Sequence, residues 1–329
     1  MADTVQIVVT PGSGDGRAQS TARRLQRALA RRGYATRAQT FTDLARLLEW
    51  SATCAPTFSH LVGVGGDATL SAAAAAAVRL SIPFVPVPCG FGNMFARAFG
   101  FKDETRRVIE LFERGQVRRV DVGMANGHDI FLSHRSYGFL AEIQEAVERE
   151  RAQPRSRMMR HLAYYAMGER FLVSVPLTAV RVEVDGTVLA EDAAVVTVAN
   201  VETYRGFLSL TPTASPIDGF FDIFVIPGGS KLTVWTRIFR LLLRLPGRWD
   251  GVILCHGRSV RVTVNGRTDQ DKLTLRRRAL PLLVLPESME ILKARQTEAE
   301  AEVAVAPAAA TAGTPLVSAP RGAGLPRPT

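Results

Sequence analysis

The strongest constraint on the fold of this chain is residues 62–70, an apolar stretch that changes abruptly into two glycines, an aspartate and a threonine. Ser71 and six alanines follow directly, and alanine favours a helix more than any other residue. The pattern predicts a buried strand, a tight turn at Gly65 and Gly66, and a helix over residues 69–80.

The turn has the chemistry of a phosphate-binding site. Glycines let the backbone approach a ligand closely, and the N–H groups at the start of a helix attract phosphate oxygens. Asp67 adds a negative charge beside such an anion, which makes sense if a divalent cation or a hydroxyl to be deprotonated lies between them. The alternative is an ordinary strand–helix turn in which Asp67 or Thr69 caps the helix.

Two further apolar runs end in glycine-rich turns that lead into helical patterns, at residues 82–97 and at residues 7–14. In an open parallel sheet such turns gather at the carboxyl edge, where nucleotides bind. None of the three has the Gly-Lys-Ser/Thr of a P-loop or the spacing of a dinucleotide fingerprint. We expect Gly66→Val to abolish nucleotide binding, because a β-branched side chain would occupy space meant for phosphate and would not tolerate the backbone angles of the turn.

Taken in order, these segments resemble the diacylglycerol kinase catalytic-domain family, which includes bacterial lipid kinases and sphingosine kinases and is related in fold to NAD kinases. The family's GGDGT, PLGTGNDFAR and NPxSG motifs, its crossing into a second domain and its Pro-x-Ala…Asp-Gly segment are similar to residues 65–69, 88–97, 10–14, 120–139 and 212–222.

The chain also departs from the family pattern. Ala68, Phe91 and Met94 stand where the family has Gly, Thr and Asp, and the late Asp-Gly-Glu falls on residues 269–271, which read Asp-Gln-Asp. Two glycines are missing from the turn at residues 204–207. A diverged relative that binds nucleotide or lipid without turnover is therefore an alternative, as is a kinase of a soluble, NAD-like substrate.

The resemblance implies a lipid kinase that transfers the γ-phosphoryl of ATP, with Mg²⁺, to a hydroxyl of diacylglycerol, a sphingoid base or a related amphiphile. It implies Asp218 as the metal ligand, and Asp271 or Asp67 as the catalytic carboxylate. The nucleotide would be bound by the residues of the turns and strand ends: Thr10, Gly12, Ser13, Thr40, Gly65, Gly66, Asp67, Ala68, Thr69, Gly90, Phe91, Gly92 and Asn93.

The pattern along the chain predicts a doubly wound α/β domain over residues 1–122 and a mainly antiparallel, β-sandwich-like domain over residues 123–294, with the active site in the cleft between them. Asp-Gly and Asn-Gly pairs between β-branched runs predict hairpins in the second domain. Residues 295–329 are rich in alanine and proline, which predicts a disordered tail.

Composition limits the setting in which the protein works. No apolar run is long enough to span a bilayer and the N-terminus is too polar for a signal peptide, so we expect a cytoplasmic protein. The formal net charge is +10, but no nucleic-acid-binding module is recognisable. A homodimer is compatible with this sequence.

The second domain contains a helical pattern at residues 232–245, with apolar positions and an arginine stripe at Arg237, Arg240 and Arg244. One interpretation is a helix that packs on a sheet and points these arginines into solvent. The other is an interfacial helix that holds the enzyme on an anionic membrane, where a lipid substrate resides.

Overall fold

The computed structural model describes residues 4–11, 16–90, 92–143, 145, 177–202, 204–205, 208–243, 245, 249–265 and 270–304. These residues form two compact units. Unit 1 takes those within Met1–Arg135, Ala199–Phe220 and Asp271–Val303, and unit 2 takes those within Ser136–Val198 and Phe221–Gln270. The contiguous domains expected at residues 1–122 and 123–294 stay a prediction, and the compact units cross those boundaries.

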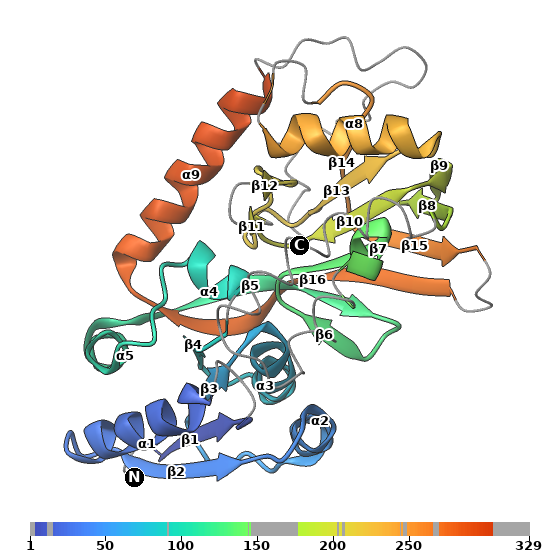
Figure 1. Cartoon of the computed structure of the whole chain (residues 1–329). Coiled ribbons are helices and arrows are strands. Elements are labelled where there is room, and N and C mark those ends of the chain that lie inside the picture. Colours follow the sequence, from blue (N-terminus) through green and yellow to red (C-terminus); the bar gives the residue numbers. More distant parts are fainter. Residues whose placement is uncertain are drawn as a thin grey trace, which may run out of the picture. The chain divides into compact units, whose positions relative to one another are not determined.

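Unit 1 is built on a sheet whose strands are neighbours in the order β2 (Ala35–Thr40), β1 (Thr4–Val9), β3 (His60–Gly65), β4 (Phe84–Pro88) and β16 (Gln270–Val284) (Figure 1). Strands β1 to β4 pair in parallel. Strand β16 pairs in parallel with β4 and antiparallel with β5 (Gln116–Ala125), which pairs in turn with β6 (Asp129–Phe131). A strand from late in the chain therefore joins the first sheet.

Helices cover both faces of the parallel strands. Ile7 and Val8 point to opposite faces of β1 because side chains alternate along a strand, and both are fully buried. Contacts join α1 (Arg17–Ala30) to α5 (Thr105–Arg114), and α2 (Leu44–Thr53) to α3 (Asp67–Leu80). The doubly wound α/β architecture predicted for the first part of the chain is confirmed.

Unit 2 contains strands in antiparallel pairs, as predicted. Strand β8 (Val180–Val184) lies between β15 (Ser259–Val264) and β9 (Thr187–Ala193). A second set of neighbours runs β14 (Ile253–Gly257), β13 (Phe221–Ile226), β10 (Val195–Ala199) and β7 (His134–Gly138). Asp185 and Gly186 have φ of 48° and 88° between β8 and β9, the left-handed pair that a two-residue hairpin turn requires.

The helical elements of the later chain differ from expectation at one point. Helix α8 spans Lys231–Leu242, close to its predicted range, and α9 spans Pro286–Ala304. Residues 295–304 are therefore helical where the sequence predicts a tail without structure. Residues 305–329 lie outside the described residues, as do residues 146–176 and the two-residue turn between the short strands β11 (Tyr204–Arg205) and β12 (Leu208–Ser209).

Candidate functional site

The parallel strands bring the predicted turns to one edge of the unit 1 sheet. The last pairs in the register are Val9 with Thr40, Val9 with Val64, and Gly65 with Pro88. The residues that follow β1, β3 and β4 therefore lie side by side beyond the carboxyl ends of the strands, where open α/β sheets bind ligands. Thr40, an exposed residue, ends β2 at the same edge.

A hydroxyl pair joins the first of these turns to helix α3. Thr10 Oγ1 lies 2.6 Å from Thr69 Oγ1, and both residues are buried. The contact fixes the end of β1 against the first turn of α3. Gly12, Ser13 and Phe91, which were also predicted to bind nucleotide, lie outside the described residues.

The turns after β3 and β4 touch through their glycines. A Cβ on Gly90 would lie 2.7 Å from Gly66 Cα, and a Cβ on Gly65 would lie 2.6 Å from the Cβ of Thr69. Cys89 N donates to Gly65 O at 2.8 Å, which holds the two turns together. Side chains at Gly65 or Gly90 would therefore force the backbone apart.

Gly66 itself is less constrained than the sequence suggests. Its φ is −87°, which any residue adopts, and a Cβ there would meet Gly90 Cα at 3.6 Å, an ordinary contact. The expectation of backbone strain at Gly66 is wrong, because the close approach falls on its neighbours. The effect of Gly66→Val on nucleotide binding stays a prediction.

The carboxylate of Asp67 organises the second turn. Its Oδ2 accepts a hydrogen bond from Asn93 N at 2.8 Å and its Oδ1 accepts one from Met94 N at 3.0 Å, at the start of α4 (Met94–Ala98). A Cβ on Gly92 would lie 2.8 Å from Asp67 Oδ2, so glycine is needed for this approach. Asp67 thus caps the backbone of a turn that begins more than twenty residues later in the chain.

Asn93 closes the same turn on itself. Its φ is 49°, a left-handed conformation that Asn tolerates better than most residues. Its Oδ1 accepts from Gly90 N at 3.1 Å, and its Nδ2 donates to Gly90 O. The ordered turn is therefore held by two polar side chains, Asp67 from outside and Asn93 from within.

Ala68, the residue that replaces a family glycine, occupies the first turn of α3 with its side chain exposed. Its φ is not positive, so the position has no need of glycine. Alanine is favoured over glycine in a helix by about 1 kcal/mol. This departure from the family pattern is therefore compatible with the observed turn.

A buried carboxylate on β5 forms a second cluster, whose role the sequence did not reveal. Asp121 is 1% exposed; its Oδ2 accepts from Gly219 N at 2.8 Å and its Oδ1 from Arg278 N at 2.6 Å. Burial raises the pKa of Asp121, although these two backbone N–H groups act in the opposite direction. The available signal was a charged residue between Val120 and Val122, in a run that reads as a buried strand.

Hydrogen bonds connect this cluster to helix α3. Asn200 Nδ2 donates to Asp121 O and to Leu132 O, each at 3.0 Å. Leu132 N in turn donates to Ser71 Oγ at 3.3 Å. The first turns of α3 and the Asp121 cluster therefore belong to one connected region of unit 1.

Asp218, the predicted metal ligand, lies beside that cluster. Its Oδ1 accepts from Phe220 N at 3.0 Å, in a turn where Gly219 has φ of 84°. A Cβ on Gly219 would lie 2.6 Å from Arg277 Nε, so the guanidinium packs over this turn. Asp121 holds the turn through Gly219 N, and it thereby fixes the backbone next to Asp218.

Asp271, the predicted base, lies at the start of β16. Its Oδ1 accepts from Asn126 Nδ2 at 2.8 Å, and Lys272 N donates to Asn126 Oδ1 at 2.9 Å. Asn126 begins the turn between β5 and β6; at about 3.3 Å per residue it is about 16 Å along the chain from Asp121. The structure therefore does not place Asp271 within the Asp121 cluster, and Asp269 lies outside the described residues.

The turn at Asn126 could have been anticipated from sequence. Asn126 is followed by Gly127, with φ of 52° and 81°, and Asn-Gly between two strands is a strong hairpin signal. What the sequence did not contain is the partner, because Asp271 is brought to this hairpin only by the pairing of β16 with β5.

Among the described residues, His, Cys, Asp and Glu side chains nowhere gather in groups of three or more that could hold a metal ion. Burial raises the pKa of the Cys89 thiol beside the second turn, which keeps the thiol protonated and unreactive. In the part of the chain that the structure describes, no helix combines the length and the apolar character needed to cross a bilayer.

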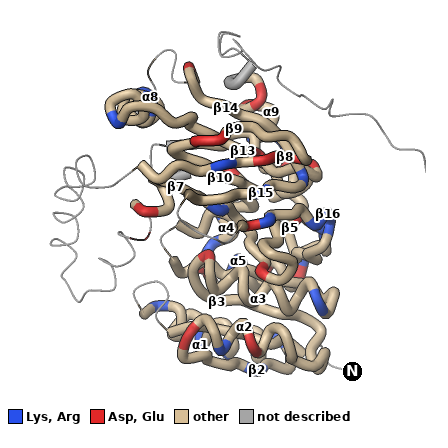
Figure 2. Tube along the Cα trace, turned by 90° about the vertical axis from the view of Figure 1, so that its right-hand side faces the viewer, with Lys and Arg blue, Asp and Glu red and all other residues tan. Residues whose placement is uncertain are grey.

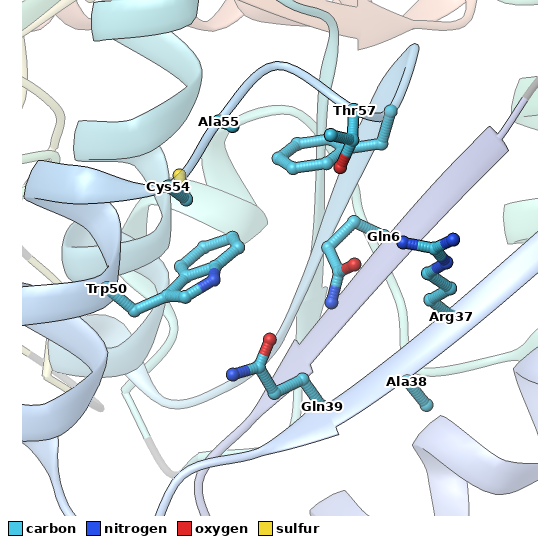
Figure 3. A pocket seen from close by; sticks show the side chains of 9 residues that line it. Gln6, Arg37, Ala38, Gln39, Trp50, Cys54, Ala55 and Thr57 are labelled. Carbon is cyan, nitrogen blue, oxygen red and sulfur yellow. The ribbon is translucent and has the colours of Figure 1, made fainter.

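A cavity of about 530 Å³ lies between α2 and β2 (Figure 3). Trp50 and the amides of Gln6 and Gln39 face the same space. No residue predicted to bind nucleotide or metal lines it, within the described chain; the lining residues are Gln6, Arg37, Ala38, Gln39, Trp50, Cys54, Ala55, Thr57 and Phe58. It is separate from the turns described above.

Comparison with known proteins identifies two matching families of domain. Residues 4–125 match the diacylglycerol kinase catalytic domain, and residues 136–293 match the YegS C-terminal NAD kinase beta sandwich-like domain. A solved structure of a diacylglycerol kinase from Bacillus anthracis strain Sterne is 20% identical and superposes with a TM-score of 0.64, covering 87% of this chain and 98% of that chain. At this identity the likeness concerns the fold alone.

Two named relatives are more similar in sequence. A diacylglycerol kinase of Bacillus subtilis is 28% identical over 190 residues, 57% of this chain and 61% of the relative. A diacylglycerol kinase of Staphylococcus saprophyticus is 26% identical over 189 residues, 56% of this chain and 58% of the relative. The matches thus span about three fifths of these relatives' own length. Together, the two matched segments show that the chain belongs to the family of proteins built on the diacylglycerol kinase catalytic domain.

Proposed function

We propose that this protein transfers the γ-phosphoryl of ATP to a hydroxyl of diacylglycerol, a sphingoid base or a related amphiphile. The observation that carries the proposal is the pair of glycine turns at the sheet edge, held together by Asp67. They place bare backbone next to the start of α3, which has no side-chain cap. Such a helix start attracts phosphate oxygens.

In this proposal, different residues of the sheet edge bind different parts of ATP. Backbone N–H groups at Gly66–Thr69, at the start of α3, and at Gly92 hold the phosphates, while the Thr10–Thr69 hydroxyl pair keeps the first turn of α3 in place. Thr40, exposed at the end of β2, contacts another part of the nucleotide. Positioning of this kind supplies most of the catalysis in phosphoryl transfer.

The residues present fit a magnesium ion. Mg²⁺ in nucleotide sites is commonly held by one or two carboxylates together with substrate phosphates and water, and Asp218 supplies one carboxylate next to a turn that Asp121 holds rigid. When bound, the ion would neutralise charge that develops on the phosphate oxygens. Asp218 would orient it, and the Asp121 side chain would keep the Asp218 turn in position.

The acceptor hydroxyl must lose its proton, and two carboxylates are candidates. Both oxygens of Asp67 accept backbone N–H groups, which leaves that carboxylate with fewer lone pairs for a proton. Asp271 accepts a side-chain amide from Asn126. We therefore assign the proton to Asp271, with Asp67 as the alternative.

The test is incubation of the full chain with γ-labelled ATP, Mg²⁺ and diacylglycerol, ceramide or sphingosine in detergent micelles, followed by separation of lipid from water-soluble products. The proposal expects label in one lipid, and none with Asp271→Asn. Binding of ATP without label in any product would contradict it and favour a nucleotide-binding module. Label only on a water-soluble acceptor such as NAD would favour the other alternative.

A further inference from the structure

Helix α8 exposes large apolar side chains that unit 2 does not bury. Leu232 and Phe239 are 77% and 57% exposed, and Leu243, the C-cap residue that follows the helix, is 53% exposed. At 3.6 residues per turn the three positions fall within about 40° of one another around the helix. We call these three residues the apolar stripe.

The opposite face of α8 anchors it to unit 2. Val234, Ile238 and Leu241 are buried, and Trp235 meets Phe139 edge-on with ring centroids 5.0 Å apart. Ser230 Oγ caps the helix by accepting from Thr233 N at 3.1 Å. The helix is therefore fixed through one face and presents the apolar stripe on the other, where packing within the described part of unit 2 gives no reason for apolar side chains.

The charges around the apolar stripe have one sign. Residues 231–249 contain five basic residues and no acidic one, and Lys231 and Arg240 are exposed. Figure 2 shows basic positions of α8 in blue. Arg240 Nη1 lies 4.0 Å from Asp250 Oδ2, a distance at which a solvated pair is weak.

Arg237 belongs to the row of arginines predicted from sequence, but its contacts lie within unit 2. Arg237 Nη1 donates to Pro227 O at 3.1 Å, and its guanidinium packs over Gly251. Arg244 lies outside the described residues. The surface available to a partner therefore consists of the apolar stripe with Lys231 and Arg240.

We infer that the apolar stripe of α8 docks into the surface of a membrane that contains anionic lipid. An amphipathic helix binds a bilayer by burying apolar side chains at the headgroup boundary while basic residues attract anionic lipid. A second copy of this chain fits the surface less well, because two such helices would bring Lys231 and Arg240 against basic residues. The inference deepens the proposed function, since a lipid acceptor resides in that surface.

The test measures binding of the full chain to sedimented vesicles, of phosphatidylcholine alone or mixed with phosphatidylglycerol, without ATP and without diacylglycerol. Leu232→Gln/Phe239→Gln/Leu243→Gln should weaken binding to the anionic vesicles roughly 100-fold. Lys231→Gln/Arg240→Gln should weaken it about tenfold and reduce its salt dependence. The matched control is Leu44→Gln/Leu48→Gln on α2, where the leucines are 39% and 40% exposed, and it should bind like the parent.

Equal binding by the apolar-stripe variant and the parent would overturn the inference, as would a parent that ignores anionic lipid. A parent dimer that the same variant splits, with vesicle binding unchanged, would show that a second copy covers the stripe. If the triple variant does not fold, Phe239→Trp decides: brominated lipid should quench its emission more than that of the parent. Label transfer to a dispersed short-chain diacylglycerol tests the kinase separately, because that reaction needs no docking.

Discussion

Two carboxylates in unit 1 make the same kind of contact in opposite surroundings. Asp67, at the sheet edge, and Asp121, on β5, each accept two backbone N–H groups from distant parts of the chain, one segment for Asp67 and two for Asp121. Asp121 is 1% exposed, whereas Asp67 is half-buried. At the sheet edge, water or a ligand can replace a lost hydrogen bond to Asp67. Inside the buried Asp121 cluster, nothing can replace a lost hydrogen bond.

The sheet edge around Asp67 can therefore exchange hydrogen-bond partners with a ligand, whereas the Asp121 cluster holds the fold of unit 1 in place. At the edge, glycine contacts and Asp67 order the turns that follow β3 and β4. In the cluster, Asp121 ties the Asp218 turn to β16. We therefore expect substitutions at the edge to act on binding, and substitutions in the cluster to act on stability.

The largest expected effect decides whether a third carboxylate carries the chemistry. Asp271→Asn should lower kcat about 10²–10⁴-fold with little change in the KM for ATP, because a positioned base contributes that much. Asp271→Glu, which restores the family residue, should keep substantial activity. Steady-state kinetics with ATP varied at fixed lipid would measure both.

The control for that experiment is Asp129→Asn, a half-buried acid on the same β5–β6 hairpin, which should react like the parent. Near-normal turnover by Asp271→Asn would remove Asp271 from the mechanism. Asp67 would then be the candidate base, and the sheet edge would carry out both nucleotide binding and proton transfer.

The next effect concerns the buried member of the pair. Asp121→Ala leaves Gly219 N and Arg278 N without their acceptor, and each buried unsatisfied donor costs about 1–3 kcal/mol. We expect the free energy of unfolding, from urea titration, to fall by about 3 kcal/mol. Asp121→Asn keeps one acceptor and should cost less; equal stability of Asp121→Ala and the parent would break the comparison with Asp67.

Asp121 also gives unit 1 a pH dependence with a defined sign. Because its pKa is raised above 3.8 in the fold, the folded state binds the proton more strongly than the unfolded state. The contribution of Asp121 to the free energy of unfolding therefore falls as pH rises from about 3.8 through the raised pKa. This decline in unfolding free energy should be absent from the Asp121→Ala curve.

Removal of the carboxylate at the sheet edge should lower the free energy of unfolding less than removal of Asp121 does. Asp67→Ala frees Asn93 N and Met94 N, whose hydrogen bonds to the half-buried Asp67 are only part-buried, and loss of such a capping side chain costs about 1 kcal/mol. Nucleotide affinity, measured by fluorescence of a labelled ATP analogue, should fall far more than stability. A loss of stability as large as that of Asp121→Ala would contradict the division between the two regions.

The smallest expected effect tests one departure from the family pattern, the alanine at residue 68. Ala68→Gly restores the family residue in an exposed helical position, and should lower the unfolding free energy by about 0.5–1 kcal/mol. Nucleotide affinity should not change. A clear gain in affinity would instead show that Ala68 obstructs the phosphate site.

The sequence predicted the edge well because its information is local. Strand, glycine turn and helix follow one another in the chain, so α3 begins within two residues of its predicted start at residue 69 and ends at its predicted end, residue 80. The resemblance to the family also placed Asp67 and Asn93 at one site. Their mutual contact, with Asp67 bonding to Asn93 N, was not predicted, because it depends on two turns meeting in space.

The Asp121 cluster could not be predicted in the same way. It joins β5, the Asp218 turn and β16, which come from three distant parts of the chain. The bend of β16 that presents Arg278 N, where φ is 49° and the register shifts between residues 276 and 280, has no local signature. The roles of the predicted site residues and the cleft between the domains stay predictions.

The most direct measurement for the account as a whole is calorimetric titration of ATP with Mg²⁺ into the parent and Gly90→Ala. A Cβ at residue 90 would lie 2.7 Å from Gly66 Cα and 2.9 Å from Asn93 Oδ1, so it would push the two turns apart. With Ala68→Gly as the control at the same edge, we predict that the parent and the control bind ATP with equal affinity. Gly90→Ala should bind at least roughly 100-fold more weakly, the loss of about 2.7 kcal/mol of contacts. Equal affinity of folded Gly90→Ala and the parent would show that ATP does not bind at this edge.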